Sequence, residues 1–256
     1  MLISITEQCH MGCPHCMDNA TPEGNHMSMD TFMDAIQFFN KYGGIECIIT
    51  GGEPTENPLW LEMLEYALKN ANGSTGTNIA HVTLTTNAMR IANNRDIQTY
   101  LMLLMQKYDK KLAVQVTHVD GLYPLGVDLS SNFFKCSLVT VCTEIEAMYP
   151  LGRARENNLP WQSKCSKCFN IRSAVRTYQS LDMATFLLAT KMKFCTPRVN
   201  WNGDLKLGES RLCPTVCTIY DDNETIVKNI CNFKCRGCDI INKNLPLTHL
   251  KAIGEA

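Results

Sequence analysis

Three cysteines near the start of the chain have the spacing of a metal-cluster loop. Cys9, Cys13 and Cys16 follow the pattern C-x3-C-x2-C. Gly12 and Pro14 lie between them and can bend the loop so that the thiolates converge. An iron–sulfur cluster held by three thiolates keeps one iron open to bind and activate another molecule, whereas a fully ligated cluster mainly transfers electrons. The pattern therefore indicates a cluster that performs chemistry.

Zinc is the alternative ligand of this loop. His10 or His15 could join the three thiolates in a tetrahedral site, as in a zinc knuckle. Spacing by itself does not separate the two metals.

The remaining cysteines suggest a second metal region. The chain has 14 cysteines in 256 residues, and eight of them fall between residues 165 and 238. Clustered cysteines in a chain without a secretion leader are more often metal ligands than disulfides. Cys47, Cys136 and Cys142 occur singly in or beside predicted strands, and we expect them to be small core residues.

A second motif follows a predicted buried strand at residues 45–50. It consists of Gly51, Gly52, Glu53 and Pro54. Glycines expose backbone carbonyls at close range, and Glu53 can accept hydrogen bonds from an ammonium group. An ordinary turn before a helix is the alternative for this segment alone. Together with the preceding cysteine loop, it resembles the radical S-adenosylmethionine (SAM) superfamily, in which a G-G-E-P segment holds the amino group of SAM.

The resemblance implies an enzyme of oxidoreductase type. A [4Fe-4S] cluster on the catalytic Cys9, Cys13 and Cys16 would reductively cleave SAM to methionine and a 5′-deoxyadenosyl radical, which abstracts a substrate hydrogen. His15 is expected beside these cofactors. The chemistry also implies a reducing electron donor such as flavodoxin or ferredoxin, and a site that excludes water.

Further candidate cofactor contacts follow later predicted strands. Thr86 and Asn87 match a T-N pair that family members place beside SAM, although a plain strand-ending turn is the alternative. Gln115 and Thr117 are positioned to meet the ribose or the methionyl carboxylate. Arg153 lies in a G-R-A segment that resembles one near the adenine or carboxylate in relatives, or it is a surface charge.

Three residues after the fourth predicted strand are candidate substrate contacts: His118, Asp120 and Tyr123. Helix-capping or surface roles are the alternative.

The C-terminal cysteines resemble an auxiliary-cluster module. Seventeen residues separate Cys195 from Cys213, with a predicted hairpin tip at Asn202 and Gly203 between them. The pattern resembles the SPASM and twitch modules, and the shorter twitch form fits better because the full SPASM cysteine series is absent. The resemblance implies one auxiliary [4Fe-4S] cluster on Cys195, Cys213, Cys235 and Cys238. A second could use Cys165, Cys168, Cys217 and Cys231, and zinc is the alternative at either site.

Strands and helices alternate along the first part of the chain. Apolar patterns predict strands at residues 1–6, 45–50, 80–85, 112–117 and 137–142, and helices at 28–42, 57–70 and 96–107. Such alternation indicates an α/β fold with a parallel sheet, whose strands bind ligands at their carboxyl ends. The resemblance implies a partial (β/α)6 TIM-like barrel.

The sheet is expected to end near residues 144–149, a short helix or turn. A helix at 173–191 and a hairpin at 198–206 follow. We therefore predict a radical SAM core at residues 1–160 and, at 161–256, a helix plus a small cysteine-rich auxiliary cluster domain containing the hairpin.

Composition limits the partners. With 24 basic and 25 acidic residues, the chain has no net positive charge that would attract a nucleic acid. No apolar stretch reaches the roughly 20 residues of a membrane span. Low-potential iron–sulfur chemistry and thiolates imply a reducing cytoplasm.

Three functions fit these features. The first is a radical SAM maturase that modifies a peptide or protein. The alternative is a dehydrogenase or rearrangement enzyme for a small molecule such as a sugar alcohol. A nonenzymatic iron–sulfur or zinc-binding module is the third.

Overall fold

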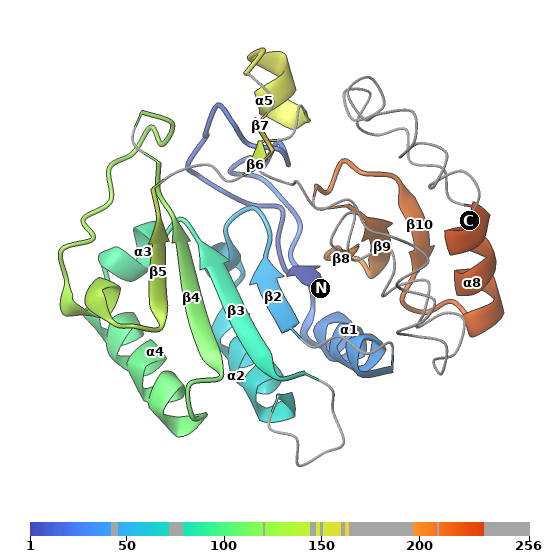
Figure 1. Ribbon diagram of the computed structural model, residues 1–256, viewed down its shortest axis with the longest axis horizontal. Coiled ribbons are helices and arrows are strands. Elements are labelled where there is room, and N and C mark those ends of the chain that lie inside the picture. The colour runs from blue at the N-terminus through green and yellow to red at the C-terminus, as the bar shows by residue number, and fades with distance from the viewer. Residues whose placement is uncertain are drawn as a thin grey trace.

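A computed structural model describes residues 1–41, 46–71, 79–119, 121–143, 147–148, 151–159, 162–163, 197–208 and 210–232 of the chain. Within them lies an α/β fold built on an eight-stranded sheet of order β10-β9-β8-β1-β2-β3-β4-β5 (Figure 1). The six strands from β8 to β5 run parallel, and β9 and β10 add an antiparallel edge. The strands are β1 Leu2–Ser4, β2 Glu46–Thr50, β3 His81–Thr86, β4 Leu112–Thr117, β5 Val139–Cys142, β8 Pro197–Val199, β9 Asp204–Leu207 and β10 Thr215–Thr218.

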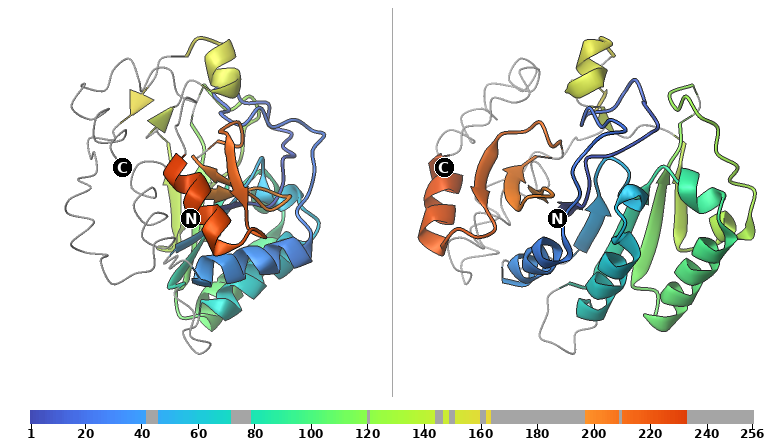
Figure 2. Two further views of the ribbon diagram at one scale, coloured as in Figure 1. Left: turned by 90° about the vertical axis from the view of Figure 1, so that its right-hand side faces the viewer. Right: turned by 180° about the vertical axis from the view of Figure 1, so that it is seen from behind.

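The helices that connect the first strands cover one face of the sheet (Figure 2). They are α1 Met29–Lys41, α2 Trp60–Asn70, the short α3 Met89–Ala92 and α4 Arg95–Lys107. Side-chain caps mark the beginning of α1 and α4, whereas α2 and α3 have none. Ser28 Oγ accepts from the Thr31 amide at 3.1 Å, and Asn94 Oδ1 accepts from two amides of the first turn of α4.

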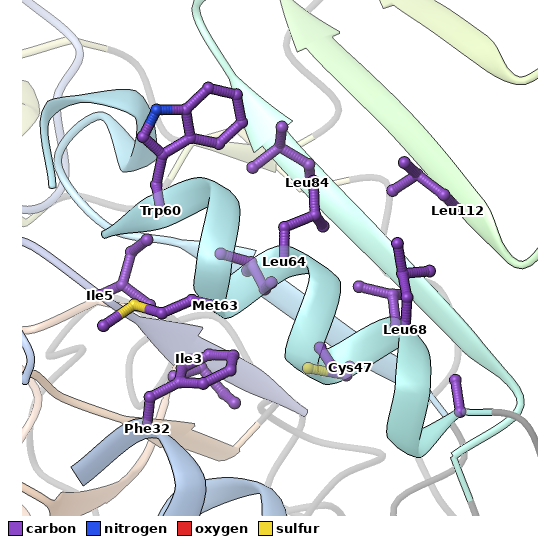
Figure 3. Close-up of a cluster of buried hydrophobic side chains, with 14 of the residues drawn as sticks. Ile3, Ile5, Phe32, Cys47, Trp60, Met63, Leu64, Leu68, Leu84 and Leu112 are labelled. Carbon is purple, nitrogen blue, oxygen red and sulfur yellow. The ribbon is translucent and has the colours of Figure 1, made fainter. Parts of the chain in front are cut away.

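The hydrophobic core fills the layer between these helices and the sheet (Figure 3). Phe32 of α1 and Leu64 of α2 are fully buried there against Ile3 and Leu84 of the strands. Cys47 also belongs to this layer, and burial raises the pKa of its thiol to about 12. The prediction that Cys47 is a small core residue is confirmed.

The predicted strands and helices of the first part of the chain are present with small shifts at their ends. The helix expected from residue 57 begins only at Trp60, because Asn57 binds backbone carbonyls of other segments. Its side-chain amide donates to the carbonyls of Ile5 and Met27 at 2.8 and 3.1 Å. A 3-10 turn, η1 Pro54–Glu56, precedes it.

Two expectations for the later part of the chain are wrong. The sheet does not end after β5, since β8 pairs with β1 at the opposite edge, Leu2 beside Arg198. The expected helix or turn at 144–149 contains a strand instead, β6 Ala147–Met148, which pairs with β7 Gln162–Ser163. The first error concerns strands far apart in the sequence, whose pairing local patterns do not reveal.

The predicted hairpin is confirmed as β8 and β9. The Asn200 amide donates to the Asp204 carbonyl at 2.9 Å, and Gly203 adopts a φ of 87°, which favours glycine. Five further elements were not predicted: α3, η2 Asn132–Lys135, α5 Gly152–Glu156, β10 and α8 Asn223–Asn232. The helix expected at 173–191 lies outside the described residues. Among the helices that are described, none is long and apolar enough to cross a membrane.

Candidate functional site

A cavity of about 550 Å³ opens at the carboxyl ends of β1 to β4. The loops that follow parallel strands meet there, which is the usual place for a ligand in this class of fold. The cavity also extends down the strands, as far as Leu2 and Ile48. The predicted site residues that line it are Cys9, Cys13, His15, Cys16, Gly51, Gly52, Glu53, Thr86, Asn87, Gln115, Thr117 and Arg153.

The cysteine loop presents its three thiols to this cavity. Cys9 and Cys13 are buried and Cys16 is half-buried, and Gly12 bends the loop with a φ of 65°. Burial, reinforced by the neighbouring thiols, raises the pKa of Cys13 to about 12. Burial likewise raises the pKa of Cys9 to about 11. These thiols therefore ionise readily only when a cation takes the place of the proton, as in a metal site.

The two histidines of the loop have different surroundings. His10 is exposed, and its Nδ1 lies 3.3 Å from Glu56 Oε1. The His15 ring packs instead against Tyr123, with ring centroids 5.3 Å apart. Among the described residues, no three His, Cys, Asp or Glu side chains are arranged to hold a single metal ion. His15 lines the same cavity as the cysteines, whereas His10 is not among the lining residues.

Gly51 and Gly52 let the loop after β2 pass directly over the loop after β1. The Gly52 amide donates to the Thr6 carbonyl at 2.8 Å. A Cβ on Gly51 would lie 2.4 Å from that oxygen, and one on Gly52 would lie 2.3 Å from the Gln8 carbonyl. The close approach of two backbones is thus a structural reason for both glycines.

Glu53 is the polar centre of the site. Its Oε1 accepts from the Thr86 hydroxyl at 2.6 Å and from the Thr55 hydroxyl at 2.7 Å, while its Oε2 accepts from the Asn87 amide at 2.7 Å. Burial raises the pKa of the carboxyl, and these hydrogen bonds oppose the shift. Because Oε2 accepts only one of these bonds, it keeps capacity for a donor in the cavity. Pro54 is buried at the start of η1 and is not among the residues that line the cavity.

Thr86 and Asn87 join the end of β3 to the other two loops. Thr86 reaches Glu53, and the Asn87 side-chain amide lies 3.8 Å from Cys9 Sγ. They form a strand-ending turn, since Ala88 and Met89 donate their amides back to them. Thr86 and Asn87 therefore form a strand-ending turn and also line the cavity, so neither interpretation of this pair excludes the other.

Arg153 binds two backbone carbonyls of the cysteine loop and the segment that follows it. Its Nε donates to the Cys13 carbonyl at 2.9 Å and its Nη1 to the Ala20 carbonyl at 2.8 Å. Gly152 is needed beside it, because its φ is 53° and a Cβ there would lie 2.8 Å from the Cys16 carbonyl. Arg153 is thus half-buried against the loop and is not simply a surface charge.

Gln115 and Thr117 of β4 line the cavity together with Tyr123, whereas His118 is not among the lining residues. The Tyr123 hydroxyl donates to Thr117 Oγ1 at 2.9 Å, and its ring lies 5.2 Å from that of His118. Gln115 Nε2 approaches Cys142 Sγ at 3.4 Å. Tyr123 lines the cavity, whereas Asp120 lies outside the described residues.

The C-terminal cysteines are only partly described. Cys213 is buried beside Gly208, whose added Cβ would lie 2.4 Å from Cys213 Sγ. Cys217 lies in the main hydrophobic core, and burial raises the pKa of its thiol to about 12. Neither lines the cavity. Cys231 lies on α8, while the remaining candidates lie outside the described residues: Cys165, Cys168, Cys195, Cys235 and Cys238.

Two charged residues of the cavity, Asp18 and Arg198, were not predicted from the sequence. Asp18 comes two positions after Cys16, and Arg198 lies in β8 between Pro197 and Val199. A charged residue on a predicted strand hints at a buried pair, but nothing in the sequence connects two residues 180 positions apart.

The fold and the site together define an α/β protein with a three-cysteine loop at the carboxyl edge of a parallel sheet. Residues 3–120 match the model of the Radical SAM superfamily. The matched residues contain the cysteine loop and the G-G-E-P segment.

Similar proteins include curated enzymes named GTP 3′,8-cyclase. The one from Haemophilus influenzae is 30% identical over 129 residues, which are 46% of this chain and 36% of that enzyme. The one from Actinobacillus succinogenes is 33% identical over 100 residues, which are 36% of this chain and 27% of the enzyme. The matched part thus spans about a third of these relatives' length.

Two solved structures are distantly similar. The first is anSMEcpe with bound AdoMet and a peptide, with 13% identity, a TM-score of 0.45 and coverage of 91% of this chain and 80% of that one. The second is Streptococcus suis SuiB bound to the precursor peptide SuiA, with 14% identity, a TM-score of 0.49 and coverage of 91% and 66%.

Proposed function

We propose that this chain is a radical SAM enzyme that binds a [4Fe-4S] cluster through Cys9, Cys13 and Cys16 and cleaves SAM reductively. The observation that carries the proposal is the meeting of the cysteine loop, Gly51 to Glu53 and the Thr86–Asn87 turn around one cavity. Their donor set fits both cofactors, with three thiols for iron and carboxylate, amide and hydroxyl groups for a polar ligand. When bound, the reduced cluster supplies the electron that converts SAM to methionine and a 5′-deoxyadenosyl radical.

The chain's own residues would position SAM and shield the reaction. Glu53 Oε2 is the proposed acceptor for the amino group, because it lines the cavity and retains a free acceptor direction. Gln115 and Thr117 of β4 also line the cavity and are proposed to bind the ribose or the carboxylate. His15 and Tyr123 would exclude water beside them, since their packed rings form an aromatic wall.

As the substrate, we propose a peptide or protein that undergoes hydrogen abstraction, with a small polyol as the alternative. In the cavity, β2, β3 and β4 present neutral hydroxyl and amide groups at Thr50, Thr85 and Gln115. The two arginines that line the described part of the cavity, Arg153 and Arg198, already donate to protein oxygens. This lining suits a neutral, hydrogen-bonding substrate better than the triphosphate of a nucleotide.

For the C-terminal part we propose one auxiliary [4Fe-4S] cluster that includes Cys213, together with Cys195, Cys235 and Cys238, in a twitch-like domain following the partial barrel. The position of Cys217 in the hydrophobic core weighs against the second ligand set. The need for a low-potential electron donor such as flavodoxin or ferredoxin, and for the reducing cytoplasm, belongs to the same proposal.

The test compares wild type with a Cys9, Cys13 and Cys16 to Ala triple variant after anaerobic reconstitution with iron and sulfide. Wild type should hold about eight irons, four for each cubane cluster, and form 5′-deoxyadenosine from SAM and dithionite. The triple variant should lose about four irons and all 5′-deoxyadenosine. A Cys136→Ala variant is the control, because that thiol lies outside the cavity. Equal iron content and no 5′-deoxyadenosine in wild type and triple variant would refute the proposal.

A further inference from the structure

The C-terminal hairpin contacts the cysteine loop through a buried ion pair. Arg198 of β8 donates to both carboxylate oxygens of Asp18, from Nη1 at 3.1 Å and from Nη2 at 2.7 Å. The same Nη2 donates to Ser4 Oγ, at the end of β1, at 2.9 Å. The side chains of Arg198 and Asp18 are only 3% and 11% exposed, so water screens this pair weakly.

A second arginine reaches the same segment from the loop between β9 and β10. The Arg211 amide donates to Asp18 Oδ1 at 2.7 Å, and its guanidinium donates to the carbonyls of Asp18 and Asn19 and to Glu7 Oε1. The neighbouring Ser210 hydroxyl donates to the Met17 carbonyl at 2.8 Å. Each residue that directly follows Cys16, up to Asn19, therefore accepts a hydrogen bond from this part of the chain.

The cysteine loop is thus held on two sides. Arg153 binds the carbonyls of Cys13 and Ala20, whereas Arg198 and Arg211 bind the segment after Cys16 through Asp18. Bidentate, charge-assisted bonds of this kind restrict orientation as well as distance. A shift of the β8–β10 segment would consequently move the backbone that carries Cys16.

We propose that Arg198, with Arg211, is a positioning residue that acts through Asp18 to place the Cys16 end of the cysteine loop. The proposal rests on the proposed function, because it assigns these residues a role toward the cluster on Cys9, Cys13 and Cys16. It makes the C-terminal segment part of the geometry of the N-terminal site.

The experiment separates positioning from simple support of the fold. It uses reconstituted full-length protein with Asp18→Asn, Arg198→Met and the double variant. Each single variant leaves a buried charge without its counterion, and the double variant removes both charges. The readouts are the thermal unfolding midpoint, the rate of iron release to a chelator, and the EPR spectrum of the reduced cluster with and without SAM. Glu65→Gln is the control, since it removes an ion pair with the exposed Lys107, away from the cavity.

Both single variants should unfold at lower temperature and release the loop-bound iron at least tenfold faster than wild type. The double variant should regain most of the unfolding midpoint but keep the fast release and an altered EPR spectrum, because the bidentate link between β8 and Asp18 is still missing. A double variant that returns to wild type in all three readouts would overturn the proposal and leave a purely structural ion pair. Unchanged iron release in the single variants would overturn it as well.

Failure of the proposed function has a different signature. In that case wild type and the triple cysteine variant would hold the same amount of iron, and no loop-bound iron would exist to be released. That result would overturn both proposals. If wild type instead loses about four irons on removal of the three cysteines, and the Asp18 and Arg198 variants behave like wild type, only the positioning role of Arg198 is overturned.

Discussion

The two faces of the central strands are used for different purposes. On the helix-covered face, Ile49, Leu84 and Val114 are fully or almost fully buried in the core. On the other face, Thr85 and Gln115 of the same strands are half-buried and line the cavity. Because successive side chains of a strand point to opposite faces, one strand contributes both to the hydrophobic core and to the cavity. The comparison predicts that substitutions one position apart affect different properties.

The largest effect is expected on the core face. Leu84→Ala should lower the free energy of unfolding by about 3 kcal/mol, because it leaves a cavity among fully buried side chains. Urea unfolding of the apoprotein measures this loss. Thr85→Ala, at the adjacent position, is the control and should cost under about 1 kcal/mol. Equal losses in the two variants would show that the faces are not divided in this way.

A smaller loss of stability, with a larger effect on the site, is expected where the two loops cross. Gly52→Ala should lower the free energy of unfolding by about 2 kcal/mol and weaken SAM binding, because the new Cβ would meet the Gln8 carbonyl at 2.3 Å. Gly126→Ala is a matched control, since nothing lies within 4 Å of its added Cβ. Unfolding and equilibrium SAM binding test both variants. Normal SAM binding by Gly52→Ala would contradict the close packing of the loops.

On the cavity face, binding should change while stability does not. Gln115→Ala should raise the dissociation constant for SAM about tenfold, the equivalent of one hydrogen bond to a charged group. The free energy of unfolding should change by less than about 0.5 kcal/mol. Titration of anaerobically reconstituted protein with SAM gives the first value, and Gln106→Ala on the exposed side of α4 provides the control. Unchanged affinity would assign Gln115 to the substrate or to no ligand.

The smallest effect concerns the pH dependence of stability. Burial raises the pKa of Glu53 above its unfolded value, so between these two pKa values the folded state holds a proton that the unfolded state has lost. Stability of the apoprotein should therefore fall as pH rises through the folded pKa. Glu53→Gln should lack this component, which urea midpoints between pH 4 and 8 would reveal. A wild-type stability that rises with pH relative to the variant would mean that the hydrogen bonds outweigh burial.

Much of the site was predictable because its residues occur in short motifs at strand ends. The cysteine loop, Gly51 to Glu53, and Thr86 with Asn87 each follow a strand that apolar patterns locate, and parallel strands bring such ends to one edge. The function of Gly52 was less accessible. Its contact with Gln8 depends on how two loops pack, and the sequence alone suggested only backbone exposure to a ligand.

The sequence by itself determined the alternating strands and helices, the capping of α1 and the hairpin at Gly203, because each depends on residues close together in the chain. Only the tertiary structure decided that β8 joins the sheet beside β1 and that Arg198 meets Asp18. The physical reason is that an ion pair between residues 180 positions apart carries no local periodicity. Its energy arises only when the packed sheet removes both charges from water.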